Sequence, residues 1–494
     1  MPNGRSTVDS SGAGLPLPLL HRSPGYPSAT EGDPPPERVL WVGDGVFIRA
    51  FAGTLLQGLH DQGLFDGSVV VTPARAGSAA KQAALHAQDG LYTVWTRGRQ
   101  DGATVDRVDL VDVVARLVDP FARWFDFLAC AAQRSISVVI SNTTELGIAY
   151  EPIPMPTAVA PRLYPARLTA YLRHRFDHFD GDPAAGMVIL PCELIERNGG
   201  LLRDIVLRHA GDWGLSPRFT RWVQSANAFC DTLVDRIVPG FPSAGARDAW
   251  NRNGYEDRCL VTAEPYYLWV IKRQEQAMQA LPFHRSTLNV RYVDDLVPYR
   301  IQKLRVLNGA HSLMAPLGLA RGLTTVRDCM THPVLGPLVR RAVEDVIVSY
   351  SELDADTLHA YAGTVFERFL NPYLDHRLRA ITLNAVGKYR IRLLPVMRRY
   401  IDLHGSPPPD LCLSLATLLL LYHPGSPDTP ADDPETIDKL RRAWTTSTHI
   451  SELVRQVLSD PALWGTDLTA LPELVPRMTE AMDHLRGGGW QGME

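Results

Sequence analysis

The sequence contains no long apolar run and no paired cysteines. Its longest apolar segment, LCLSLATLLLLY at 411–422, covers about 12 residues, whereas a bilayer-spanning helix needs about 20. The six cysteines are scattered without a C-x-x-C pair, which indicates a reducing compartment and no structural zinc. The first residues lack the basic and apolar pattern of a secretory signal. We therefore expect a cytoplasmic protein with no membrane partner.

The chain also carries little excess charge. Its 494 residues have a net charge of −4 at pH 7, and no basic run is interleaved with aromatic side chains. A nucleic-acid-binding protein normally displays a basic face, so we expect no nucleic-acid partner. The contents of hydrophobic residues (45%) and charged residues (21%) are those of an ordinary globular chain, here long enough for two or three domains.

Composition divides the chain into three parts. Residues 1–37 hold eight prolines with many glycines and serines, which predicts a disordered tail. Residues 38–299 alternate short apolar runs with helical patterns, which predicts an α/β, Rossmann-like domain. Residues 300–494 have helical apolar spacing, which predicts a mostly α-helical C-terminal domain that carries the substrate-binding and catalytic groups.

A glycine turn follows the first predicted strand. Residues 39–42 are apolar and partly β-branched, Gly43-Asp44-Gly45 follows, and helical spacing begins at Ile48. Strand, Gly-x-Gly and helix open a dinucleotide-binding unit, because glycines let the backbone approach a pyrophosphate at a helix N-terminus. Ile48 stands where G-x-G-x-x-G has its third glycine, so a plain strand-to-helix turn stays open as the alternative.

The next predicted strand and its loop bear on the choice of cofactor. The segment 68–77 has no acidic residue to bind the ribose hydroxyls of NAD, while Arg75 is available to a 2′-phosphate of NADP. An ordinary solvent-exposed arginine is the simpler reading of Arg75. The loop by itself leaves both cofactors open.

Two further predicted strands end in polar loops. The strand at 136–140 runs into Ser141, Asn142, Thr143 and Glu145, and the strand at 187–190 runs into Glu193, with Asn198 a little later. Ligands bind at the carboxyl edge of a parallel sheet, so we expect the first loop near the nicotinamide half of a cofactor.

The segment KLRVLNGAHS, at 303–312, mixes polar and apolar side chains on one predicted helix face. At about 100° per residue, Lys303, Asn308 and His311 share an arc of about 140° with two leucines. Burial lowers the pKa of a lysine, which suits a general acid/base, and an asparagine amide can donate to an oxyanion. The alternative is that Lys303 extends to water while Asn308-Gly309 ends or kinks a helix.

These residues resemble a known family. The pattern K-x-x-x-x-N-x-x-H at 303–311 is similar to the catalytic signature of the mannitol dehydrogenase family, the polyol-specific long-chain dehydrogenases. GDGVFIRAF at 43–51 resembles the N-terminal motif of that family, with Phe47 and Arg49 at matching positions. Further blocks resemble the tagaturonate reductase (altronate oxidoreductase) branch: SNTTELGIAY at 141–150, PCELIERNG at 191–199, CDTLVDRIVPG at 230–240 and LNAVGKYRIRLLP at 383–395.

The resemblance implies an NAD-dependent, metal-independent oxidoreductase that interconverts D-tagaturonate and D-altronate in hexuronate catabolism. It makes Lys303 the general acid/base, Asn308 an oxyanion donor and His311 a substrate-orienting group. The cofactor residues implied are Gly43, Asp44, Gly45, Phe47, Arg49, Ser141, Asn142, Thr143 and Glu145. The substrate residues implied are Glu193, Asn198, Asp235, Arg236, Asn384 and Lys388, with Arg390 as a further cation for a sugar-acid carboxylate.

Departures from the wider family favour an acidic sugar over a neutral polyol. Leu194 stands where mannitol dehydrogenases have an asparagine, and Ala380 where they have an arginine. The resemblance favours NAD, with NADP still open. The alternatives are a fructuronate reductase or mannitol 2-dehydrogenase of the same family and, more remotely, a non-catalytic NAD-binding redox sensor.

Overall fold

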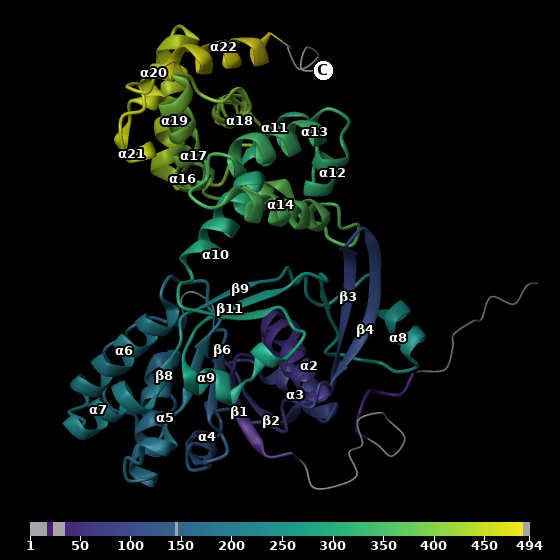
Figure 1. Ribbon diagram of the computed structural model, residues 1–494, viewed down its shortest axis with the longest axis vertical. Helices are drawn as coiled ribbons and strands as arrows, with labels where there is room; N and C mark the ends of the chain where they lie inside the picture. Colours follow the sequence, from purple (N-terminus) through teal and green to yellow (C-terminus); the bar gives the residue numbers. More distant parts are fainter. Residues whose placement is uncertain (1–16, 23–34, 144–146, 488–494) are drawn as a thin grey trace, which may run out of the picture. The chain divides into compact units, whose positions relative to one another are not determined.

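The structure, a computed structural model, describes residues 17–22, 35–143 and 147–487. The chain divides into two compact units, whose elements are labelled in Figure 1. Unit 1 takes Met1–Thr96, Arg107–Ala263 and Arg273–Tyr292, and unit 2 takes Arg97–Asp106, Glu264–Lys272 and Val293–Glu494. This division differs from the single boundary expected between 299 and 300, because the chain makes two short excursions into unit 2 before it finally stays there.

A six-stranded parallel sheet forms the centre of unit 1. Its strand order is β5-β2-β1-β6-β7-β8, with β1 at Glu37–Val42, β2 at Ser68–Thr72, β5 at Val114–Leu117, β6 at Val138–Ser141, β7 at Val188–Pro191 and β8 at Ala228–Phe229. Strands β2, β6 and β7 are buried along their whole length, as expected for Val- and Ile-rich strands covered on both faces. The predicted Rossmann-like domain is confirmed.

The strand order reverses direction between β1 and β6. This is the order of two mononucleotide-binding halves joined side by side, and ligands bind where it reverses. In the register of the pair, Val42 lies opposite Ser141, so the loops that leave both strands begin next to each other. The glycine turn after β1 and the polar loop after β6, both identified in the sequence, therefore begin side by side at the switch point of the sheet.

Helices cover the sheet of unit 1, and α5 packs between α4 and α6 in its core. The helical segments are α1 (Val46–Ile48), the π-helix η1 (Arg49–Gly53), α2 (Thr54–Asp61), α3 (Ala79–Ala87), α4 (Trp124–Ala131), α5 (Tyr164–His178), the 3-10 turn η3 (Pro183–Ala185), α6 (Asn198–Asp212), α7 (Pro217–Ala226), α8 (Ala246–Asn253), α9 (Glu275–Ala280) and the 3-10 turn η4 (Phe283–Arg285). The remaining strands are β3 (Tyr92–Gln100), β4 (Ala103–Val111), β9 (Thr232–Asp235), β10 (Val261–Ala263), β11 (Leu268–Lys272) and β12 (Val290–Val293).

Part of the N-terminal segment is folded against unit 1. Leu20 is fully buried, its backbone N–H donates to the Glu256 carbonyl oxygen, and the Glu256 N–H donates back to that of Pro18. Arg22 donates to the carboxylate of Asp89. The expectation of a wholly disordered tail at 1–37 is therefore wrong for 17–22, because an apolar side chain and an arginine find partners that composition does not reveal.

Unit 2 is helical, as predicted, and α11 lies at its centre, in contact with α12, α13, α15, α16 and α18. Its helical segments are α10 (Val297–Gln302), the π-helix η5 (Lys303–Leu307), α11 (Asn308–Ala320), α12 (Val326–Thr331), α13 (Leu335–Arg341), the π-helix η6 (Ala342–Val348), α14 (Ala355–Phe369), α15 (Leu378–Ile381), α16 (Ala385–Arg392), α17 (Leu394–His404), α18 (Pro409–Leu420), α19 (Pro434–Thr446), α20 (Ile450–Leu458), α21 (Pro461–Trp464) and α22 (Leu474–Arg486). All of α11 from Gly309 to Leu319 is buried, which explains the apolar character of that stretch.

Candidate active site

The first glycine turn has the shape of a phosphate cradle. Gly43 has φ +134°, and a Cβ atom there would lie 2.7 Å from the backbone oxygen of Asn142, so the position requires glycine. Gly45, directly before α1, has an ordinary φ of −71°, and a Cβ atom there would meet nothing within 4 Å. Packing within the protein therefore does not require glycine at position 45, and the space beside Gly45 is open. Such a space fits a dinucleotide pyrophosphate.

The neighbouring predicted residues are held in different ways. Asp44 Oδ2 is buried without a hydrogen-bond partner among the described residues, while Phe47 stacks on Phe51 with ring centroids 5.0 Å apart. Arg49 donates to the carbonyl oxygen of Cys259, and its guanidinium lies 5.6 Å from the ring centroid of Tyr92. Arg49 therefore has a structural role, because it holds η1 to the segment before β10.

The side chain of Glu193 holds the loop after β6 through hydrogen bonds. The carboxylate oxygen Oε1 accepts from the backbone N–H and the hydroxyl of Thr143, both within 2.9 Å, and Oε2 accepts from Ser141 Oγ at 3.1 Å. Asn142 Nδ2 donates to the carbonyl oxygen of Cys192. Ser141 and Thr143 thus stand at the predicted edge, whereas Glu145 lies outside the described residues.

Glu193 was assigned to substrate binding from the resemblance, and its surroundings point instead to a positioning role. The side chain is 2% exposed, and both oxygens already accept hydrogen bonds from the protein. Burial raises the pKa of this carboxyl group above its ordinary value, against the hydrogen bonds from Thr143 and Ser141, which lower it. Its contacts brace the loop after β6.

Three other predicted substrate residues of unit 1 are also buried. The Asn198 amide, 1% exposed, donates to the carbonyl oxygens of Pro191, Glu193 and Thr232 and accepts from two backbone N–H groups. Asp235 is 4% exposed at the end of β9, and Arg236 donates to the Ala50 carbonyl oxygen. These contacts tie β7, β9 and η1 together.

In unit 2, a π-helical turn joins Lys303 to Asn308. The backbone N–H of Asn308 donates to the carbonyl oxygen of Lys303, so the two residues lie about one turn apart on the same side of the helix. A regular α-helix would separate them by about 140° around the axis. Both side chains are half-buried rather than fully inside, so the expectation of a buried lysine is wrong in degree.

His311 completes the predicted triad from deeper in the fold. It is 7% exposed, and its ring lies tilted against Phe369 at 4.6 Å and meets His376 edge-on at 4.7 Å between centroids. Burial, with a further contribution from Arg368, lowers the pKa of His376. His376 was not singled out from the sequence, because it lies far along the chain from the signature at 303–311.

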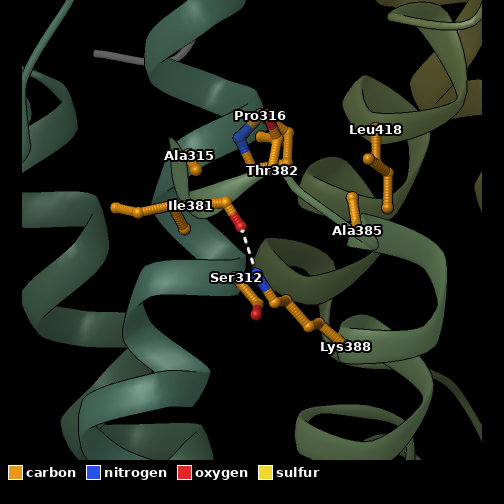
Figure 2. A pocket seen from close by; sticks show the side chains of 8 residues that line it. All are labelled: Ser312, Ala315, Pro316, Ile381, Thr382, Ala385, Lys388 and Leu418. Atoms are coloured by element: carbon orange, nitrogen blue, oxygen red, sulfur yellow. Dashed lines mark hydrogen bonds between the residues drawn. The ribbon is translucent and has the colours of Figure 1, made fainter. Parts of the chain in front are cut away.

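Lys388 lines a small pocket formed by Ser312, Ala315, Pro316, Ile381, Thr382, Ala385, Lys388 and Leu418. Figure 2 shows Lys388 reaching from α16 toward Ile381, whose carbonyl oxygen accepts from Nζ at 3.0 Å, with Ser312 of α11 beside it. Asn384 is exposed directly before α16, with φ +54°. Arg390 instead donates to the Leu463 carbonyl oxygen of α21, so that candidate cation is away from Ser312 and Lys388.

Arg392, which the sequence analysis did not single out, makes hydrogen bonds to the start of α11. Its Nη1 donates to the backbone oxygen of Asn308 at 3.2 Å and to Ser312 Oγ at 3.0 Å. The available signal was its spacing: it lies four residues after Lys388, which in a helix places both side chains on the same face.

No group of three or more His, Cys, Asp or Glu side chains in 17–22, 35–143 and 147–487 is arranged to hold a metal ion. Within the same ranges, every helix is too short or too polar to cross a membrane.

Two domain models of one family match the chain. The model of the mannitol dehydrogenase Rossmann domain matches residues 37–283, and that of the mannitol dehydrogenase C-terminal domain matches residues 295–486. The chain belongs to the mannitol dehydrogenase family and is an oxidoreductase that acts on CH–OH groups.

Within that family, curated relatives point to one branch. The chain is 37% identical to the altronate oxidoreductase of Bacillus subtilis (strain 168) over 92% of this chain and 94% of that protein. It is 38% identical to the altronate oxidoreductase of Halalkalibacterium halodurans over 90% of both chains. The resemblance found in the sequence is thus confirmed.

Solved structures agree on the fold. The Pseudomonas fluorescens mannitol 2-dehydrogenase, solved with NAD and D-mannitol, has a TM-score of 0.65 at 20% identity and covers 93% of this chain and 94% of its own. A D-sorbitol dehydrogenase in substrate-free form has a TM-score of 0.77 at 19% identity and covers 97% of this chain and 98% of its own.

Proposed function

We propose that this protein is an NAD-dependent oxidoreductase that interconverts D-tagaturonate and D-altronate. Relatives named altronate oxidoreductases, at 37–38% identity over at least 90% of the chain, support the substrate. The observation that carries the chemistry is the π-turn that brings a lysine and an asparagine onto one side of a helix. The six cysteines are buried and form no disulfide among the described residues, which fits the reducing cytoplasm.

The unit 2 residues have distinct roles in this proposal. During reduction the Lys303 ammonium gives its proton to the ketone oxygen, and during oxidation the neutral amine takes that proton back. Asn308 donates a hydrogen bond from its side-chain amide to the same oxygen as negative charge develops on it. His311, held between aromatic neighbours, orients the substrate.

The residues of unit 1 fit a dinucleotide. The open space at Gly45 and the close backbone approach at Gly43 suit a pyrophosphate, and the β6 loop held by Glu193 suits the nicotinamide half. When bound, the nicotinamide supplies or accepts the hydride. The loop after β2 carries no acid for the ribose hydroxyls, so NAD is proposed from the resemblance and has to be tested against NADP.

The test is oxidation of NADH, followed by absorbance, with D-tagaturonate, D-fructuronate and D-fructose offered in parallel. Each substrate is repeated with NADPH and with the Lys303→Ala variant. The proposal expects the highest kcat/KM for D-tagaturonate with NADH, and loss of that turnover in the variant. A preference for D-fructuronate or D-fructose would assign a sister activity, and no turnover of any substrate would contradict the proposed chemistry.

A further inference from the structure

Two cations lie one turn apart on α16. Lys388 and Arg392 occupy positions i and i+4, where like charges destabilise a helix. Burial lowers the pKa of both side chains, that of Arg392 to about 10, and the charge of Arg392 lowers the pKa of Lys388 further. Such a pair is unfavourable in isolation, so its presence calls for a negative charge that offsets it.

The described residues do not supply that charge to Arg392. Arg305, in the π-turn, differs from Arg392 because it has an acidic partner. It forms a bidentate ion pair with Glu352 and also donates to the backbone oxygens of Ile391 and Arg392. Arg392 forms no ion pair within 17–22, 35–143 and 147–487, and its hydrogen bonds there go to a backbone oxygen and a hydroxyl.

The carboxylate of Asp432 interacts with Lys388, but it already accepts hydrogen bonds from other groups of the protein. Asp432 raises the pKa of Lys388 slightly against the larger effect of burial, but it accepts from the Tyr422 hydroxyl and from the Val386 backbone N–H. Lys388 Nζ has one described acceptor, the Ile381 carbonyl oxygen, which leaves further N–H groups for a ligand. Asp432 therefore acts on Lys388, while no described acidic side chain forms an ion pair with Arg392.

The guanidinium of Arg392 has an open side. Its Nη1 is bonded to Asn308 and Ser312, whereas Nε and Nη2 make no hydrogen bond to any described residue and are not buried. Two parallel N–H groups on one edge of a guanidinium match the two oxygens of a carboxylate. The hydrogen bond from Nη1 to the Asn308 backbone holds the Nε and Nη2 edge near Asn308. Asn308 is the residue proposed to donate to the ketone oxygen of the substrate.

We propose that Arg392 binds the carboxylate of the sugar-acid substrate through Nε and Nη2, with its Nη1 fixed by Asn308 and Ser312. This inference rests on the proposed function, because it takes the substrate to be a keto acid with its carboxylate away from the reacting carbonyl. The pocket of Figure 2 lies alongside, since Ser312 and Lys388 both line it. Arg392 thereby determines specificity for an acidic sugar over a neutral one.

The experiment compares the full-length wild type with Arg392→Gln, Arg392→Lys and the matched control Arg390→Gln, whose guanidinium lies at α21. Steady-state kinetics are measured with D-tagaturonate, D-fructuronate and D-fructose, and NADH binding by fluorescence. We expect Arg392→Gln to raise KM for the acidic substrate about 10- to 100-fold, as expected when a charged hydrogen bond is lost, with kcat changed less than threefold. Arg392→Lys recovers part of the loss, and Arg390→Gln behaves like wild type.

The outcomes separate the inference from the proposed function. If the wild type turns over D-tagaturonate and Arg392→Gln leaves KM unchanged, or lowers kcat while KM stays constant, the carboxylate assignment is wrong and the function stands. If the wild type prefers D-fructuronate and the variant raises that KM, the assignment stands and the proposed function is wrong. If D-fructose is the best substrate and the variant does not affect it selectively, both are wrong.

Discussion

Asn308 and Lys303 are joined by a backbone hydrogen bond that spans five residues, from the N–H of Asn308 to the carbonyl oxygen of Lys303. Arg305 lies within the same turn and anchors it to the end of α16 through the backbone oxygens of Ile391 and Arg392. The wider turn therefore depends on tertiary contacts as well as on local sequence. Its effect is to align two side chains that an α-helix would point apart.

Lys303→Met tests the proton-transfer role. The substitution keeps an unbranched side chain of similar length and removes the ammonium group, so we expect kcat/KM for D-tagaturonate to fall about 10²- to 10⁴-fold. The side chain is half-buried, so the thermal unfolding midpoint should stay close to that of wild type. The matched control is Lys272→Met, at an exposed lysine of β11. Equal activity of Lys303→Met and its control would remove Lys303 from the chemistry.

Asn308→Asp tests the oxyanion donor. The aspartate has the same shape but supplies an acceptor where the proposal needs a donor, so we expect kcat to fall about 10²- to 10³-fold. The π-turn hydrogen bond uses the backbone N–H and survives the change, so far-UV circular dichroism should be unaltered. Asn251→Asp, at an exposed asparagine of α8, serves as the control. A change in KM with kcat preserved would instead indicate a binding role.

The sequence predicted the cofactor side of the fold well, for a physical reason. Short runs of β-branched residues, such as the one that becomes β2, have few stable alternatives to a buried parallel strand. Once β1 and β6 are recognised, the rule that ligands bind at the carboxyl edge brings Gly43 and Asn142 together, as observed. Local pattern and global topology agree there.

The geometry of the π-turn and the roles of the buried polar side chains could not be predicted without the three-dimensional contacts. A helical wheel assumes 3.6 residues per turn, so it misplaces Lys303 relative to Asn308, because the π-turn depends partly on Arg305 and its partners. The buried polar residues Glu193 and Asn198 look like ligand-binding groups in the sequence, although hydrogen bonds to neighbouring loops use most of their polar atoms. Arg392 was overlooked because its significance comes from the absence of an acidic partner among the described residues.

Alanine at the two turn glycines should separate folding from cofactor binding. Gly43→Ala forces a Cβ atom toward the Asn142 oxygen at positive φ, so we expect it to destabilise the protein by more than about 1 kcal/mol. Gly45→Ala meets no protein atom and has a permitted φ, so the unfolding midpoint should be unchanged or slightly higher. Its methyl group enters the space proposed for the pyrophosphate, so the dissociation constant for NADH should rise. Chemical denaturation and fluorescence titration measure the two effects, and unchanged NADH binding by Gly45→Ala would contradict the proposed cradle.

The stability of unit 1 should depend on pH through Glu193. Burial raises the pKa of this carboxyl group in the folded state, so the folded protein holds the proton more tightly than the unfolded chain, whose ordinary value is about 4.3. The stabilisation by the protonated form is complete below that value and is lost as the pH rises through the folded-state pKa, with a slope of at most about 1.4 kcal/mol per pH unit.

In Glu193→Gln the Gln oxygen can still accept from Thr143 while its amide donates to Ser141 Oγ, so the variant keeps the contacts and loses the titration. We expect the free energy of unfolding of the variant to exceed that of wild type by a margin that grows from pH 4 to pH 7, with Glu473→Gln, at an exposed glutamate, following wild type. Parallel profiles for wild type and Glu193→Gln would mean that the carboxylate is stabilised by its donors as fully as it is by water in the unfolded chain.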